Sequence, residues 1–497
     1  MTKLHKNQMN RLRKSFFEAY ENNDILKAIL TGERILKIYE YNNCTNNLYF
    51  CDDAYNLACV YSEDGKFTSS VSLFKKSAEI LEKLQGKNLQ YTNILNNLAI
   101  DLSNSGQYDA SLKTFKEIYS IRKNILKENH PDYINCLVNL GSSYFETDDY
   151  DNALIYHKKA LSLREKKDLD YADNLNFIGY DLEEAEDFDK AAEYFAEALE
   201  IIKKVKGARS EEYLKNLYYL GFIYDKNKNF LESKNCYEKS VELIKIYIEE
   251  NHPYYAEALN KLANSYLRLG YENKALTLRI KSLNIIKNIV GKNHLYYASN
   301  LKNIGDIYFK KNDFKRAKKM YEESLEIKKN ILGENNDEYA RDSSMLAKTY
   351  IKEKEFLRAE KILIFLTSYF KNSHNLKDLK NENKDDEKEF YMTLLLDLAF
   401  IYVATNNAPK LYSIYKEFEW LEPGLSFDEM LEDISSFAEN ENLSFNNDNI
   451  SENPFNKPDF SEENPLFENI EDFFLNSDIE NEKYGFDFDD AEPDDET

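Results

Sequence analysis

The sequence is poor in the residues that interrupt or crosslink helices and in those that build metal centres. Its 497 residues include 14 Gly, 8 Pro, 5 Cys and a single Trp. The cysteines form neither a Cys-x-x-Cys pair nor a zinc-ligand pattern with histidine, so neither a disulfide framework nor a metal site is predicted. No run reaches the roughly 20 apolar residues of a membrane span, and the first thirty residues lack the apolar core of a secretory signal. We therefore expect a cytoplasmic protein without a cofactor.

Catalytic motifs are missing as well. The sequence has no phosphate-binding Gly-rich loop, no His-Glu-x-x-His and no nucleophile elbow. Three of the six histidines, His130, His252 and His294, fall at equivalent turns of a repeated pattern, which indicates an architectural role. The sequence thus predicts a protein that is not an enzyme.

What the sequence does contain is one pattern of about 42 residues, repeated about nine times. Each copy has a small residue near the end of its first predicted helix, and most copies lie 41 or 42 residues apart, with one interval of 38 and one of 52. A second small residue follows twelve positions later, except at Leu411. Fixed periods of this length predict a stacked helical solenoid. The first column is Ala58, Ala99, Gly141, Gly179, Gly221, Ala263, Gly305, Ala347 and Ala399; the second is Ser70, Ser111, Ala153, Ala191, Ser233, Ala275, Ala317 and Ala359.

Apolar residues recur around these columns with helical spacing, which makes each unit a helical hairpin. Segment 137–163 has Leu140, Gly141 and Tyr144 followed by Tyr150 and Ala153, and in this it resembles a tetratricopeptide repeat. The long period and turns such as Glu128-Asn129-His130-Pro131 are similar to those of kinesin light chains. The resemblance covers roughly residues 45–420. It implies an all-α, right-handed superhelical solenoid whose concave groove, lined by first helices, binds segments of other proteins.

The resemblance also places a column of side chains near the concave face, two residues before each small residue of the first helices. Asparagines in this column resemble those with which such repeats bind a peptide backbone, because an amide both donates and accepts hydrogen bonds. Aromatic residues midway would add an apolar pocket. The alternative is a polar, exposed helix position in an Asn-rich chain. The predicted partner-groove residues are Asn56, Asn97, Asn139, Phe177, Tyr219, Lys261 and Asn303.

Charge is distributed unevenly along the chain. The net charge is −24, and residues 421–497 account for −23 of it. Five of the eight prolines also follow Trp420. High charge with few aliphatic residues predicts a disordered acidic tail over residues 441–497. Before it, Ser426 and Glu429 form a capping box, which predicts a helix within residues 421–440 that covers the last repeat.

One part of the tail has the apolar spacing of a recognition helix. Asn464 and Pro465 would begin this helix, which would fold into a groove; the alternative is a disordered segment with incidental apolar residues. Its apolar stripe is Leu466, Phe467, Ile470, Phe473 and Phe474. The predicted organisation is then a basic helical cap at 1–44, a repeat array at 45–420 with a mobile charged insert at 371–390, a capping helix at 421–440 and the acidic tail at 441–497.

Together these features predict an adaptor that binds protein or peptide partners in its groove, with no nucleic-acid partner and with the acidic tail as a candidate autoinhibitor. Two alternatives remain open. One is a helical-repeat signalling regulator that acts on a response regulator. The other is an acidic chaperone that shields basic proteins with its tail.

Overall fold

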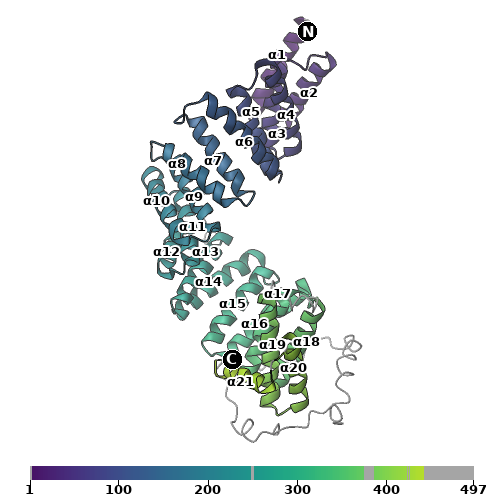
Figure 1. The fold of residues 1–497 in the computed structure, drawn as a ribbon, viewed down its shortest axis with the longest axis vertical. Helices are drawn as coiled ribbons and strands as arrows, with labels where there is room; N and C mark the ends of the chain where they lie inside the picture. The colour runs from purple at the N-terminus through teal and green to yellow at the C-terminus, as the bar shows by residue number, and fades with distance from the viewer. Residues whose placement is uncertain (1–2, 248–250, 374–384, 423, 425, 441–497) are drawn as a thin grey trace. The chain divides into compact units, whose positions relative to one another are not determined.

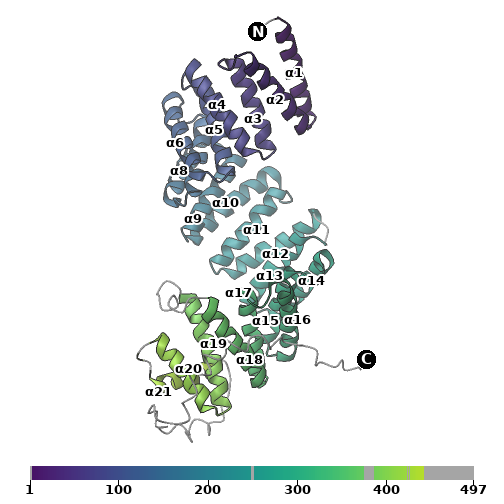
Figure 2. The same ribbon diagram turned by 90° about the vertical axis from the view of Figure 1, so that its right-hand side faces the viewer.

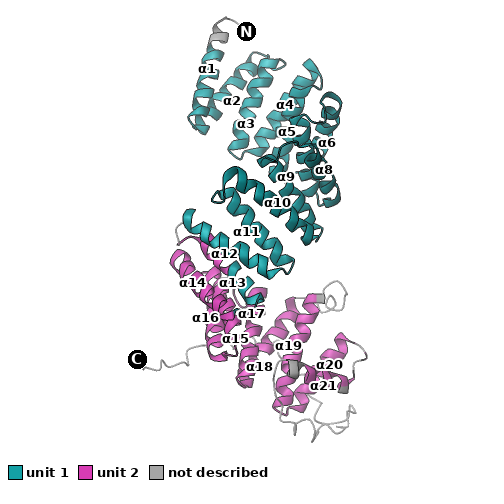
Figure 3. Ribbon diagram, turned by 90° about the vertical axis from the view of Figure 1, so that its left-hand side faces the viewer, with its two compact units in different colours: residues 1–249, 261–271 teal, residues 250–260, 272–497 magenta. Residues whose placement is uncertain are grey.

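The computed structural model describes residues 3–247, 251–373, 385–422, 424 and 426–440, and these residues form 21 helices and no strand. The predicted all-α fold of stacked helix pairs is confirmed (Figures 1 and 2). The chain divides into two compact units (Figure 3). Unit 1 is residues 1–249 with 261–271, and unit 2 is residues 250–260 with 272–497, so that α13 (Pro253–Arg268) contributes to both.

The helices follow one another as hairpins. The others of unit 1 are α1 (Lys3–Glu21), α2 (Ile25–Tyr41), α3 (Leu48–Glu63), α4 (Phe67–Gln85), α5 (Leu89–Asn104), α6 (Tyr108–Ile125), α7 (Pro131–Phe145), α8 (Tyr150–Leu163), α9 (Leu169–Glu184), α10 (Phe188–Lys206), α11 (Glu211–Lys226) and α12 (Phe230–Tyr247). Those of unit 2 are α14 (Glu272–Val290), α15 (Leu295–Lys310), α16 (Phe314–Leu332), α17 (Asp337–Lys352), α18 (Phe356–Ser373), α19 (Asp385–Ala404), α20 (Ala408–Leu421) and α21 (Phe427–Asn440).

Every hairpin turns in the same way. Two or three residues after the first helix ends, one residue has a positive φ, and a single residue then separates it from the second helix. In several hairpins this single residue is an Asp whose side chain accepts a hydrogen bond from the amide three residues on. Only some of these positive-φ residues are glycine, so the others adopt a conformation that costs an L-residue about 1 to 2 kcal/mol. The positions are Asn23, Gly65, Gly106, Asp148, Glu186, Lys228, Gly270, Asn312, Lys354 and Asn406.

Both predicted small-residue columns are buried, and a large residue of the second helix fills the space beside the first column. A methyl group on Gly179 would lie 2.5 Å from Phe195, and one on Gly305 would lie 2.7 Å from Tyr321. The predicted close approach of paired helices is therefore present, because the glycine lets the aromatic ring lie against the helix backbone.

The pair α1 and α2 has the same geometry, but here the large residue is on the first helix and the small residue is on the second. Phe16 lies 42 residues before Ala58 in the small-residue column, and Gly32 occupies the position of the second-helix aromatic. A methyl group on Gly32 would lie 3.1 Å from Phe16 and 2.7 Å from Leu57. The ring thus comes from the opposite helix, and this hairpin adds a tenth helix pair to the nine copies recognised in the sequence.

Buried polar residues of one hairpin lie against polar residues of the first helix of the next hairpin. Asp101 of α5 accepts hydrogen bonds from Ser62 of α3 (2.6 Å) and from Ser70 of α4, and Ser265 of α13 contacts Ser233 of α12 at 3.0 Å. Where the second helix carries alanine instead, the equivalent residue of the next first helix is Ile223, Ile307 or Ile401 in three of five cases. The other two are Thr349 and Asp181, and Asp181 pairs with His157. A hairpin placed against the wrong neighbour would bury an unpaired hydroxyl or carboxylate, which favours the native order of repeats.

The C-terminal helix of unit 2 begins at the predicted capping box. The Glu429 amide donates to Ser426 Oγ (3.2 Å), and the Ser426 amide donates to Glu429 Oε2 (2.8 Å). Met430 and Ile434 of α21 are fully buried in the same core as Leu394 and Leu398 of α19. The helix therefore covers the apolar face of the last hairpin.

Candidate functional site

The first helices of unit 1 lie in a row, and the predicted groove column runs across them. Successive first helices contact one another, as α3 does α5 and α7 does α9. We call this surface the first-helix face of unit 1. It carries six of the seven predicted groove residues, all half-buried: Asn56, Asn97, Asn139, Phe177, Tyr219 and Lys261.

The asparagines at one end of this face donate hydrogen bonds to side chains of the neighbouring first helix. Asn97 Nδ2 donates to the Tyr55 hydroxyl at 3.0 Å, and Asn139 Nδ2 donates to Asn96 Oδ1 at 2.9 Å. The side-chain carbonyl oxygens of Asn97 and Asn139 accept no hydrogen bond from any described residue. The NH2 group of each amide is thus held by a hydrogen bond within the protein, and the carbonyl oxygen remains able to accept one from a ligand.

Further along, the first-helix face becomes aromatic. Phe177 stacks on the buried ring of His157, with centroids 5.2 Å apart and planes at 17°. Tyr219 packs edge-on against Tyr180, and its hydroxyl donates to Glu183. Burial, and then the hydrogen bond to Glu183, raises the pKa of Tyr219. The phenol therefore stays protonated, and the ring offers a neutral, apolar surface.

The remaining predicted groove residues are more scattered. Lys261 Nζ lies 5.6 Å from the ring centroid of Phe222, at the far end of the aromatic patch. Asn303 is half-buried on α15 in unit 2 and belongs to a different body. The predicted recognition helix of the tail, Leu466, Phe467, Ile470, Phe473 and Phe474, lies outside the described residues.

Several residues of this face were not identified from the sequence. They lie three positions before or one position after the small residue of a first helix, and they include Tyr55, Asn96, Tyr180 and Phe222. The period contained a signal for them: Tyr55 and Asn97 are 42 residues apart, and Asn96 and Asn139 are 43 apart. Residues one repeat apart in neighbouring columns are neighbours in space.

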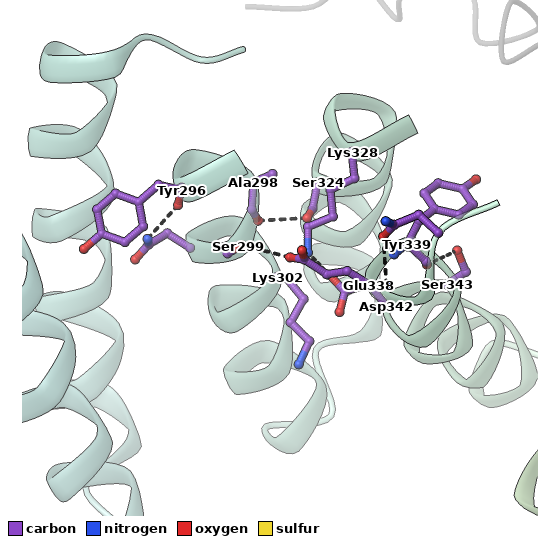
Figure 4. Close-up of polar contacts among 12 residues, drawn as sticks. Tyr296, Ala298, Ser299, Lys302, Ser324, Lys328, Glu338, Tyr339, Asp342 and Ser343 are labelled. Atoms are coloured by element: carbon purple, nitrogen blue, oxygen red, sulfur yellow. Dashed lines mark hydrogen bonds and ion pairs between the residues drawn. The ribbon is translucent and has the colours of Figure 1, made fainter. Parts of the chain in front are cut away.

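Unit 2 contains a buried lysine between α16 and α17 (Figure 4). Lys328 is 2% exposed, and its amine donates to Glu338 at 2.7 Å and to Asp342. Burial raises the pKa of Asp342, which the hydrogen bond from Lys328 opposes. Every charge here has a partner, so the cluster serves the packing of two hairpins.

The histidines and cysteines take structural positions. Nδ1 of His130, His252 and His294 accepts a backbone amide at the start of α7, α13 and α15. All five cysteines are free thiols, and burial raises the pKa of Cys136 to about 12. No group of His, Cys, Asp and Glu within the described part of the chain is arranged to hold a metal ion. Among the described helices, none has the length and apolarity required to span a bilayer.

Parts of the chain are similar to known proteins. A segment of 129 residues is 31% identical to the clustered mitochondria protein homolog of Candida albicans; the match covers 25% of this chain and 9% of that protein. Three solved structures are similar in fold. A signal-transduction ATPase with a tetratricopeptide repeat sensor from Pyrococcus horikoshii has a TM-score of 0.49 and 13% identity, covering 78% of this chain and 55% of that one. A repeat protein of Cytophaga hutchinsonii has a TM-score of 0.43 and 14% identity, covering 58% and 98%. Repeats of a putative kinesin light chain from Podospora anserina have a TM-score of 0.28 and 15% identity, covering 49% and 98%.

Helix pairs of near-constant length, crossing at small residues and stacked through matched contacts, define an α-helical repeat scaffold of the kind that binds other proteins. A family model described as tetratricopeptide repeat matches more than half of the chain. The chain therefore belongs to the tetratricopeptide repeat family, as its long repeats predict. The matched residues are 52–124, 90–166, 170–245, 212–278 and 254–330.

Proposed function

We propose that the first-helix face of unit 1 binds an extended segment of a partner protein, which makes this chain an adaptor. The observation that carries the proposal is the pair of fixed amides, Asn97 and Asn139, each with an unoccupied acceptor, beside an aromatic patch around Tyr219. Amides suit the backbone of a ligand, and aromatic rings supply the apolar surface where binding energy concentrates.

The spacing of the face specifies the ligand further. Packed helices lie about 8 to 10 Å apart, and an extended chain advances about 3.3 Å per residue. One repeat therefore corresponds to about three ligand residues. We expect a segment whose backbone N–H groups meet Asn97 and Asn139 about three residues apart, and whose apolar side chain reaches Phe177 and Tyr219 a further three to six residues along.

The test is co-purification of partners with full-length tagged protein, followed by affinity measurement for the partner that is recovered. Asn97→Ala with Asn139→Ala should weaken binding by about 1 to 3 kcal/mol, roughly five- to 150-fold, because two net hydrogen bonds are lost. The matched control is Asn124→Ala with Asn235→Ala, two exposed asparagines of second helices. Equal affinities of the two variants, with unchanged helicity by circular dichroism, would contradict the proposal.

The proposal includes competition by the tail segment from Pro465, for which the sequence predicts a recognition helix. Its apolar stripe and acidic surroundings give it the composition of a groove ligand, and it is covalently attached, which raises its effective concentration. Phe473→Ser with Phe474→Ser in the full chain should then raise affinity for the same partner. Loss of binding on this change would instead support the acidic-chaperone alternative, in which the tail itself holds the partner.

A further inference from the structure

Most hairpins bury an aromatic ring at one equivalent place between their two helices, eight residues before the small residue of the first helix. The charged residue 26 positions later, on the second helix, lies over this ring. This charged residue can be acidic or basic. The Tyr91 hydroxyl donates to Glu117 at 3.1 Å, and the Lys239 amine donates to the Tyr213 hydroxyl at 2.6 Å. The rings are Phe50, Tyr91, Tyr133, Tyr213, Tyr255, Tyr297 and Tyr391, all at most 5% exposed.

The first hairpin lacks this ring. Gln8 stands 42 residues before Phe50 and is exposed, and the residue 26 positions after it is Arg34. A cleft of about 310 Å³ lies here between α1 and α2, lined by Gln8, Arg34, Lys37, Ile38, Tyr41 and Asn42. For comparison, a cavity of about 150 Å³ holds benzene. The missing tyrosine thus leaves room for an aromatic side chain from elsewhere.

The lining residues show what chemistry the cleft would accept. Ile38 is half-exposed, whereas its equivalents Ile80 and Ile201 are 7% and 5% exposed. The Arg34 and Lys37 side chains form no ion pair or hydrogen bond with any described residue. An apolar wall with two uncompensated cations at its rim suits an aromatic ring flanked by carboxylates.

We propose that this cleft binds residues 484–490 of the chain's own acidic tail. This segment reads Tyr484-Gly485-Phe486-Asp487-Phe488-Asp489-Asp490, so that it alternates rings with carboxylates and carries no cation. Charge complementarity supports the assignment, since residues 1–44 carry a net charge of +3 and residues 441–497 one of −17. The segment around Phe473 has more adjacent apolar residues and suits the wider first-helix face instead.

The test measures binding of a fluorescent peptide of residues 481–497 to full-length protein whose own tail carries Phe486→Ser and Phe488→Ser. We expect saturable binding that weakens at least tenfold with Arg34→Glu and Lys37→Glu. The matched control, Lys75→Glu with Lys83→Glu, makes the same charge change at exposed positions of α4 and should alter affinity less than twofold.

A second variant separates loss of binding from loss of fold. Gln8→Tyr restores the ring found in the other hairpins, so the protein should melt at the same or a higher temperature while peptide binding falls at least tenfold. Equal weakening by both charge-reversal pairs would mean diffuse attraction and would overturn the proposal. So would unchanged binding by the Gln8→Tyr protein, or tighter binding of a peptide of residues 464–476 to the cleft.

Discussion

At the scale of single residues, the repeats differ in how they fill the same volume. Most place a small residue on the first helix and a ring on the second, the first hairpin reverses the two, and one hairpin uses a buried His157. His157 Nδ1 lies 2.6 Å from Asp181 of the next repeat, and burial raises the pKa of that carboxyl group against the effect of His157. These substitutions fill the same volume between the two helices with side chains of different polarity.

The close approach at Gly179 leads to a prediction about overpacking. Gly179→Ala should destabilise unit 1 by about 1 to 3 kcal/mol, because the new methyl group would lie 2.5 Å from Phe195. Gly221→Ala should cost less, since its nearest neighbour, Cys236, would be 3.0 Å away. Thermal melts followed by circular dichroism would rank the two. A larger loss at Gly221 would contradict the packing described for these hairpins.

The buried pair of His157 and Asp181 leads to a prediction about coupling. His157→Phe alone should cost about 3 to 5 kcal/mol, because it leaves the Asp181 carboxylate buried without a partner. Combined with Asp181→Ile, which copies Phe195 and Ile223 of the next repeat, the loss should disappear or become a gain. Urea melts of the unchanged protein, the two single variants and the double variant form a double-mutant cycle. Additive losses would show that the two side chains do not interact.

At the scale of helices and turns, the period made most of the fold predictable. Helix spacing and two small-residue columns were sufficient for the hairpins, because helix length and turn geometry repeat almost without change. The pair α1 and α2 was not counted among the repeats, since Phe16 and Gly32 reverse the sizes on which the columns depend. Contacts on the first-helix face, such as that of Asn97 with Tyr55, depend on rotamers and cross-helix distances that a single sequence does not contain.

The turns lead to a prediction about backbone strain. Glu186 has a φ of 57° at the turn between α9 and α10, where three other hairpins use glycine. Glu186→Gly should therefore stabilise the hairpin by up to about 1 kcal/mol, because relief of left-handed strain exceeds the added chain entropy. Glu193→Gly, at an exposed position inside α10, is the control and should cost about 1 kcal/mol. Melting temperatures that shift in the same direction would refute this account of the turns.

At the scale of the whole molecule, the net negative charge and the buried residues lie in different parts of the sequence. Nearly all of the net charge belongs to residues 421–497, and the repeats before them are close to neutral. The repeats instead bury neutral titratable groups, namely tyrosines and thiols between stacked helices. The folded repeats should accordingly respond to alkaline pH, and the acidic tail to salt.

The buried thiols of unit 1 allow the loss of folding stability at alkaline pH to be calculated. Burial raises the pKa of Cys51 to about 11 and that of Cys136 and Cys236 to about 12, from an ordinary value of 9.0. In the unfolded chain these thiols ionise first, so the folded state retains more protons between pH 8.5 and 11. The stability they contribute is therefore complete below about pH 8 and is lost as pH rises, by roughly 1 kcal/mol per thiol at pH 9.5.

Urea melts between pH 7.5 and 10 under reducing conditions would measure this loss. Cys136→Val with Cys236→Val should remove about two thirds of the contribution of Cys51, Cys136 and Cys236, because two of these three thiols no longer titrate while their apolar packing is kept. Half-buried Tyr55, whose pKa burial raises to about 12, and Cys59, whose pKa burial also raises, add a background that is common to both proteins. If the two proteins lost stability in parallel as the pH rises, the thiols would ionise as readily in the folded state as in the unfolded chain, and the burial assigned to them would be wrong.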